Sequence, residues 1–136
     1  MGELKGKCLC GAVTFSASGA SSDYHACHCG MCRRWGGGPF FAAGVGGVTF
    51  EGEDKLRRYD SSEWAERGFC GDCGTHLFYR LKGEDQYIMS VGAFDNADSF
   101  RLHGEIYIDA KPDGYAFAGD HERLTEAETI AKFTGG

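Results

Sequence analysis

The chain has 136 residues, a formal net charge of −6 at pH 7 and a pI near 5.3. Hydrophobic residues make up 42% and charged residues 25%, a globular composition that argues against a disordered chain. With 14 basic against 20 acidic residues, the basic excess that neutralises phosphates is missing, and we expect no nucleic-acid partner. The sequence contains neither a signal-peptide pattern nor the roughly 18 apolar residues of a membrane span. We therefore expect one soluble cytoplasmic domain, residues 1–136, with no membrane partner.

Short strands separated by glycine-rich turns are predicted along most of the chain. Residues 12–16 (AVTFS) alternate apolar and polar side chains, which is the pattern of a half-buried strand. Glycine supplies 22 residues, so turns are frequent, for example at 82–85 and 111–114. This pattern favours a mainly β fold of short antiparallel strands. Further strands are predicted at 40–45, 48–50, 56–59, 75–81, 86–91 and 105–108.

Two helical segments are predicted as well. Thr125-Glu126-Ala127-Glu128 matches a capping box, in which Thr125 and Glu128 satisfy each other's backbone N–H groups. We therefore expect a short C-terminal helix from Thr125 to Phe133. A single helical turn is predicted at 33–35, directly after a cysteine motif.

Seven cysteines fall into three closely spaced groups. Without a secretory signal, a disulfide framework is not expected, so clustered cysteines indicate metal ligands or catalytic thiols. A thioredoxin-type C-x-x-C motif would need a βαβ context, and the cysteine spacings of ferredoxins are absent, so zinc is the favoured cofactor. The groups are Cys8 and Cys10, then Cys27, Cys29 and Cys32, then Cys70 and Cys73.

The first and last pairs together supply four thiolates. On a strand, residues two apart share a face, so Cys8 and Cys10 can both reach one ion. In Cys70-Gly71-Asp72-Cys73-Gly74, a tight turn aims two sulfurs at one point. Four thiolates are the ligand set of a closed, structural zinc site. Spacing alone leaves open a second grouping, in which Cys8 and Cys10 join the middle cysteines.

The middle group, Cys27-x-Cys29-x-x-Cys32, offers three thiolates to one ion. Catalytic zinc keeps three protein ligands and leaves the fourth position to water or substrate. We therefore predict two zinc ions per chain, one structural and one with an exchangeable position. A fourth protein ligand for the middle group stays open, with three candidates: His25, His28 and His76.

Four stretches resemble a known family. Residues 6–15 (GKCLCGAVTF), 27–34 (CHCGMCRR) and 69–77 (FCGDCGTHL) are similar to the signature segments of the glutathione-dependent formaldehyde-activating (Gfa) family, whose domain also occurs in centromere protein V. Residues 91–95 (VGAFD) resemble a further segment of that family, whereas residues 112–124 depart from its pattern.

The resemblance implies a β-rich zinc fold called a β-tent. It assigns four cysteines to the structural zinc and three to the second zinc, the division that the spacing favours. It also implies a carbon–sulfur lyase that forms or cleaves S-hydroxymethylglutathione. The implied ligands are Cys8, Cys10, Cys70 and Cys73 for the first ion, and Cys27, Cys29 and Cys32 for the second.

The chemistry of the middle group agrees with this implication. Three thiolates give Zn²⁺ a formal charge of −1, which suits binding of another soft thiolate better than acidifying water. We predict a zinc-dependent carbon–sulfur lyase acting on a glutathione-like adduct of an aldehyde, with Cys27, Cys29 and Cys32 at the reactive centre. The alternative is a non-catalytic thiol carrier or a zinc-organised protein-interaction module.

Several neighbouring residues are further candidates. Arg33 and Arg34 either pair with substrate carboxylates or are solvated at the end of a helix. His28 is a candidate proton shuttle or supporting hydrogen-bond donor for the ligands. Asp95 is either polar lining of a pocket or a turn residue, and the turn is favoured. Three phenylalanines are expected in the core: Phe40, Phe41 and Phe69.

Overall fold

The computed structural model describes residues 3–84 and 86–134, a mainly β protein with a short C-terminal helix. No helix within these residues is long and apolar enough to cross a membrane. The helices are α1 (Gly30–Gly36), α2 (Glu126–Thr134) and the 3-10 turns η1 (Val91–Ala93), η2 (Ala97–Ser99) and η3 (Ile108–Ala110). The strands are β1 (Leu4–Lys7), β2 (Thr14–Ser18), β3 (Asp23–Cys27), β4 (Phe40–Val45), β5 (Gly47–Glu51), β6 (Leu56–Asp60), β7 (Ala65–Cys70), β8 (His76–Leu81), β9 (Tyr87–Ser90), β10 (Arg101–Ile106) and β11 (Glu122–Arg123).

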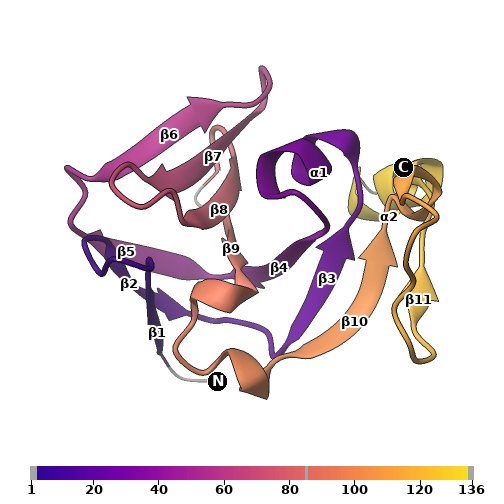
Figure 1. Ribbon diagram of the computed structural model, residues 1–136, viewed down its shortest axis with the longest axis horizontal. Coiled ribbons are helices and arrows are strands. Elements are labelled where there is room, and N and C mark those ends of the chain that lie inside the picture. Colours follow the sequence, from indigo (N-terminus) through magenta and orange to yellow (C-terminus); the bar gives the residue numbers. More distant parts are fainter. Residues whose placement is uncertain (1–2, 85, 135–136) are drawn as a thin grey trace.

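The strands form two sheets, which Figure 1 shows together. The small sheet has the order β1-β2-β5, and the large sheet has the order β11-β10-β3-β4-β9-β8-β7-β6. The small sheet packs on the large one through aromatic rings. The ring centroid of Phe50 of β5 lies 5.4 Å from that of Phe78 of β8 and 5.7 Å from that of Tyr87 of β9. The main core therefore lies between the two sheets.

Two pairings depart from the expected antiparallel pattern. β10 runs parallel to β3 on one side and parallel to β11 on the other. Parallel neighbours need a long connection, and residues 107–121 supply it between β10 and β11. In Figure 1 this segment lies beside α2 and β11, at the end of the large sheet.

Most predicted strands are present, with shifts at their ends. The predicted strand at 105–108 was displaced, because β10 covers Arg101–Ile106 and the chain turns into η3 afterwards. The predicted turn at 82–85 is present at Lys82 and Gly83, and Asp85 lies outside the described residues. Four strands were missed. These are β1, β3, β7 and β11, of which β7 carries a Glu-Arg pair and β11 consists of two charged residues.

Both predicted helices are confirmed. Thr125 Oγ1 accepts a hydrogen bond from Glu128 N at 3.2 Å, and Thr125 N donates to Glu128 Oε1 at 2.9 Å, which completes the capping box of α2. The single turn expected at 33–35 belongs to a longer helix, α1, which begins directly after Cys29.

The three phenylalanines expected in the core have different environments. Phe40 is buried beside the middle cysteines, as predicted. Phe41 was wrongly placed in the core, because it is 38% exposed and packs edge-on against Tyr24. Phe69 is half-buried, since it lines a surface groove described below.

Candidate metal centres

The structure brings Cys8, Cys10, Cys70 and Cys73 together, with all four sulfurs within 4.8 Å of one another. The Cys8–Cys10 and Cys10–Cys70 sulfur separations are 3.7 and 3.8 Å. Four thiolates at about 2.3 Å from a tetrahedral zinc ion lie about 3.8 Å apart, so this group has the spacing of a closed thiolate site. Of the two groupings that spacing left open, the structure has this one.

Two matching turns position these sulfurs. Gly11 and Gly74 directly follow the two cysteine pairs, and each has a positive φ, 79° and 78°, which favours glycine. Gly11 N donates to Cys8 O at 3.1 Å, and Gly74 N donates to Cys70 O at 2.8 Å. Each turn therefore folds a cysteine pair back toward the same point.

Backbone and hydroxyl donors stabilise the sulfurs of this first group. Val13 N lies 3.3 Å from Cys8 Sγ, and the hydroxyl of Thr75 lies 3.1 Å from Cys73 Sγ. The Thr75 contacts lower the pKa of the Cys73 thiol to about 5. A thiolate is the form that binds metal, so these donors favour ligation.

The second group consists of Cys27, Cys29 and Cys32, whose sulfurs also lie within 4.8 Å of one another. Cys27 ends β3, Cys29 is the N-cap of α1, and Cys32 lies in its first turn. Cys29 Sγ accepts a hydrogen bond from Cys32 N at 3.4 Å. Because the positive end of the helix dipole favours an anion, the start of α1 suits a thiolate.

The thiols of the second group shift one another's pKa values in opposite directions. Hydrogen bonds from the other two cysteines lower the pKa of Cys29 to about 2, aided by Cys32 N and the charge of Arg67, although burial opposes the shift. The same contacts with Cys29 and Cys32, followed by burial, raise the pKa of Cys27 above its ordinary value. Of the three thiols, only Cys29 has a lowered pKa, and a bound cation would favour the thiolate form of all three.

Arg67 of β7 is a neighbour of the second group that the sequence did not reveal. Its Nη1 and Nη2 atoms lie 3.6 and 3.7 Å from Cys32 Sγ, and the residue is only 3% exposed. The guanidinium lies between the rings of Trp35 and Tyr79, 5.0 and 5.1 Å from their centroids. A buried cation thus faces the thiolates. No local motif indicates this contact, because it joins residues 35 positions apart.

None of the three histidine candidates joins the second group. His28 has both ring nitrogens in other contacts, Nε2 with Glu105 Oε1 at 2.7 Å and Nδ1 with the Tyr115 hydroxyl at 3.1 Å. His76 stacks on Trp35, with ring centroids 4.1 Å apart. His25, two residues before Cys27 on β3, lies instead with His103 of β10 and Glu122 of β11. Within residues 3–84 and 86–134, no histidine or carboxylate completes the three-cysteine group as a fourth ligand.

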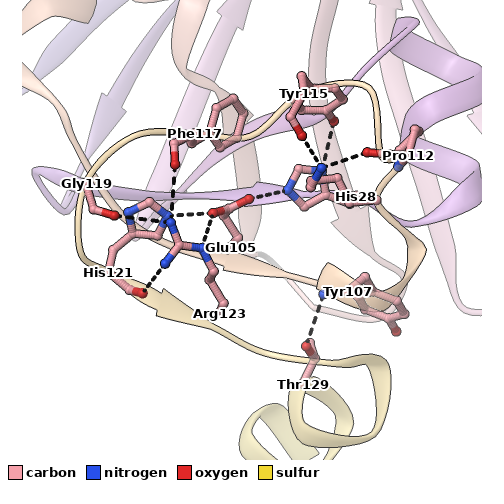
Figure 2. A network of polar contacts seen from close by, with 11 residues as sticks. His28, Glu105, Tyr107, Pro112, Tyr115, Phe117, Gly119, His121, Arg123 and Thr129 are labelled. Atoms are coloured by element: carbon pink, nitrogen blue, oxygen red, sulfur yellow. Dashed lines mark hydrogen bonds and ion pairs between the residues drawn. The ribbon is translucent and has the colours of Figure 1, made fainter.

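His28 belongs instead to a buried polar network, which Figure 2 shows from close by. Its partner Glu105 is 1% exposed and also accepts hydrogen bonds from His121 Nε2 at 2.6 Å and Arg123 Nε at 3.1 Å. Burial alone would raise the pKa of Glu105, but the hydrogen bonds from His121 and His28 outweigh it and lower the pKa. The network ties the segment before β11 to the residue between Cys27 and Cys29.

A surface groove of about 390 Å³ lies beside Trp35 of α1 and the turn at Gly74. Its lining residues are Trp35, Tyr59, Phe69, Gly74 and His76. The walls are mostly aromatic and suit the apolar stem of a small thiol.

The remaining candidates, Arg33, Arg34 and Asp95, lie at the end of a helix and in a turn. Arg33 and Arg34 are exposed in the last turn of α1, where positive charge stabilises a helix. Asp95 lies in a turn, as predicted, and its N–H donates to Lys5 O at 2.9 Å. It also lines a second groove, of about 510 Å³, together with Lys7 and His76.

Comparisons with known proteins agree with these features. The sequence profile of the family described as "Glutathione-dependent formaldehyde-activating enzyme" matches residues 3–110. The chain is 33% identical over 132 residues to an "Uncharacterized lyase" of Schizosaccharomyces pombe, covering 96% of each chain. It is 36% identical over 88 residues to a "Putative glutathione-dependent formaldehyde-activating enzyme" of Podospora anserina, where it spans 41% of the relative and the match covers 60% of this chain.

The fold also has a solved counterpart. A crystal structure of a Rhodobacter sphaeroides protein superposes with a TM-score of 0.59 over 88% of this chain and 99% of that one, at 22% sequence identity. At this identity the likeness concerns the fold alone. The profile match and the full-length fungal relative decide the family: this chain is a member of the glutathione-dependent formaldehyde-activating enzyme family.

Proposed function

We propose that this protein is a zinc-dependent carbon–sulfur lyase that forms or cleaves the adduct of a small, glutathione-like thiol with an aldehyde. The observation that carries the proposal is the three-cysteine group, which gathers three sulfurs and, among the described residues, no fourth protein ligand. Its matching four-cysteine group would hold a structural ion. The family and the lyase named among its relatives support this reaction class.

The donor set of the second group fits zinc. Soft thiolates select Zn²⁺ or Cu(I), and three of them leave a position open. When bound by Cys27, Cys29 and Cys32, zinc supplies a soft site at which a substrate thiol is held as a thiolate. Arg67, against Cys32 Sγ, offsets the negative charge that the thiolates accumulate. The side chain of Cys29 is the least buried of the three and gives access to the group.

The reaction takes up one proton in synthesis and releases one in cleavage. In synthesis, the substrate sulfur attacks the aldehyde carbon, the C–S bond forms and the carbonyl oxygen takes a proton. In cleavage, the hydroxyl returns its proton and the C–S bond breaks. Tyr79 and Tyr107 pack against the three-cysteine group, and burial raises the pKa of both phenols, which keeps their hydroxyl protons in place at neutral pH. We propose that these hydroxyls donate hydrogen bonds to the oxygen that takes up or releases the proton.

The body of the substrate would lie in the aromatic groove that passes Trp35 and His76. Arg33 and Arg34, exposed on α1, are the cations closest in sequence to the second group and would meet the carboxylates of a glutathione-like thiol. Because residues 112–124 depart from the family pattern, the thiol and the aldehyde are named here only by class.

The test compares the zinc-loaded protein with Cys29→Ser and with the distant surface control Glu53→Gln. Formation of the adduct from glutathione and formaldehyde also proceeds unaided, so the exchange rate between free and bound formaldehyde is measured by NMR exchange spectroscopy. We expect the wild type and Glu53→Gln to accelerate exchange and Cys29→Ser to lose the acceleration. Glutathione binding without acceleration would instead identify a thiol carrier, and no thiol binding would identify an interaction module.

A further inference from the structure

A third cluster of metal-binding side chains lies on the large sheet, away from both cysteine groups. His25 of β3, His103 of β10 and Glu122 of β11 each direct a ligand atom to one place, and these atoms lie within 4.8 Å of one another. The three strands are neighbours at the β11 edge of the sheet, as Figure 1 shows. The cluster contains no cysteine and takes no part in the proposed lyase reaction.

Strand register explains why the three side chains meet. Gly104 of β10 pairs with His25 on one side and with Glu122 on the other. Having no side chain, Gly104 leaves the middle position open between its two partners. An added Cβ there would lie 3.0 Å from the Glu122 carbonyl oxygen and 3.2 Å from its Cβ, so a side chain at this position would push β11 away from β10 by a few tenths of an ångström.

A β-bulge brings the second histidine to the same face. The pairing of β10 with β3 shifts between Leu102 and Gly104, so His103 is the extra residue. Its ring lies 5.2 Å from the ring of His25, edge to face. Without the bulge, neighbouring residues of a strand would point to opposite faces. The irregularity therefore places His103 where it completes the set.

We propose that His25, His103 and Glu122 form a third metal site, for a divalent first-row transition ion such as Zn²⁺ or Ni²⁺. Two imidazoles and one carboxylate are a ligand set that these ions take, with the remaining positions left to water. Ligand atoms about 2.1 Å from one ion lie roughly 3 Å apart, so the cluster must contract slightly. The side chains of His103 and Glu122 are 49% and 38% exposed and have room to do so.

Two charged side chains beside the cluster have opposite effects on the binding of a cation. Asp23 Oδ2 lies 3.9 Å from His103 Nδ1 and places a second carboxylate beside that ring. Such outer carboxylates orient ligating histidines. Lys132 of α2, in contrast, binds Glu122 Oε1 at 2.8 Å and competes with a cation for this carboxylate. A metal ion at this site would therefore compete with Lys132 for the carboxylate of Glu122, and substitution of Lys132 removes this competition.

The experiment uses untagged protein loaded with only two zinc ions per chain, the number that the two cysteine groups take, and Ni²⁺ as the probe. Equilibrium dialysis followed by elemental analysis counts both metals at once, so nickel reports the third site and zinc reports the cysteine groups. We expect one nickel ion per wild-type chain with the zinc content unchanged. His103→Ala and Glu122→Gln should weaken nickel binding by more than about tenfold, since even loss of an outer partner costs that much. Lys132→Gln should strengthen it, and Glu53→Gln should leave it unchanged.

Three results would overturn the site. These are wild-type protein that takes up no nickel, nickel that enters only as the zinc content falls below two ions per chain, and His103→Ala and Glu122→Gln variants that bind nickel as the wild type does. Because the substituted side chains are exposed, the variants should keep the wild-type fold, which circular dichroism checks. The outcome does not depend on whether the three-cysteine group is catalytic, since neither zinc content nor turnover defines the nickel site.

Discussion

His28 Nε2 lies 2.7 Å from Glu105 Oε1, and both side chains are almost completely buried. His28 stands between two cysteines of the candidate reactive site, and Glu105 lies 77 residues later on β10. This contact fixes the ring of His28 on the side of Glu105 and holds the backbone that carries Cys27 and Cys29 against β10. We regard Glu105 as the residue that positions this part of the site.

Glu105→Gln should therefore destabilise the fold. The substitution removes a buried carboxylate that accepts hydrogen bonds from His28, His121 and Arg123. Breaking a buried ionic contact by removing one partner costs about 3 kcal/mol in the free energy of unfolding. Urea unfolding of the zinc-loaded proteins measures the difference, with the exposed Glu84→Gln as a control. A loss no larger than that of the control would show that the network adds nothing to stability.

The same carboxylate predicts a pH dependence. Contacts with His121 and His28 outweigh burial and lower the pKa of Glu105 below its ordinary value of 4.5. Its stabilising effect is therefore fully present above pH 4.5 and is lost as the pH falls through the lower pKa of the folded state. The stability difference between wild type and Glu105→Gln should be constant near neutral pH and shrink only below 4.5. A difference that shrinks between pH 8 and 6 would contradict this assignment.

Arg67 is expected to tune metal affinity at the second group. Without the guanidinium beside Cys32 Sγ, the thiolates lose a buried counter-charge, so Arg67→Met should weaken zinc binding by about 10- to 100-fold. Competition with a chromophoric chelator measures the affinity. Arg67→Lys should restore part of it, because the charge returns without the paired donors. Arg57→Met, on the exposed strand β6, is the control, and equal affinities in the Met variants would refute the role.

Metal removal should affect the two cysteine groups differently. The first group joins residues about 60 positions apart, so Cys70→Ser should lose its ion and a large part of the folding free energy with it. The second group spans only residues 27–32, so Cys29→Ser should lose one ion while the near-UV circular dichroism stays close to that of the wild type. Metal content by elemental analysis, with the spectra, checks both expectations. Unfolding of Cys29→Ser would remove the distinction.

Gly68 makes a close backbone approach in the core. A Cβ at this position would lie 2.2 Å from the ring of Phe78, which is fully buried and cannot withdraw. Gly68→Ala should therefore cost about 1–3 kcal/mol through overpacking. Gly38→Ala, where nothing lies within 4 Å of the added atom, is the matched control for thermal unfolding. Similar melting temperatures for the two variants would contradict the predicted clash.

Much of the protein could be predicted from the sequence because the decisive signals are local. The cysteine spacings and the glycines that follow them define two tight turns, and Gly11 and Gly74 have the positive φ that such turns need. The capping box of Thr125 likewise specified the start of α2. Alternating patterns located most strands to within a few residues. Short-range chemistry thus indicated the fold class and the cysteine motifs, whereas only the tertiary structure decided that Cys8 and Cys10 join Cys70 and Cys73, about 60 positions away.

Tertiary structure decided what depends on residues far apart in the chain. The hydrophobic pattern gave no sign of β7, since its Glu66 and Arg67 are charged and become buried only because they meet Arg58 and Cys32. The partners of His28 likewise come from β10 and from the segment beyond it, so its role could not be read from the motif. The meeting of His25, His103 and Glu122 depends on parallel pairing and a bulge, which arise only when three separate strands come together.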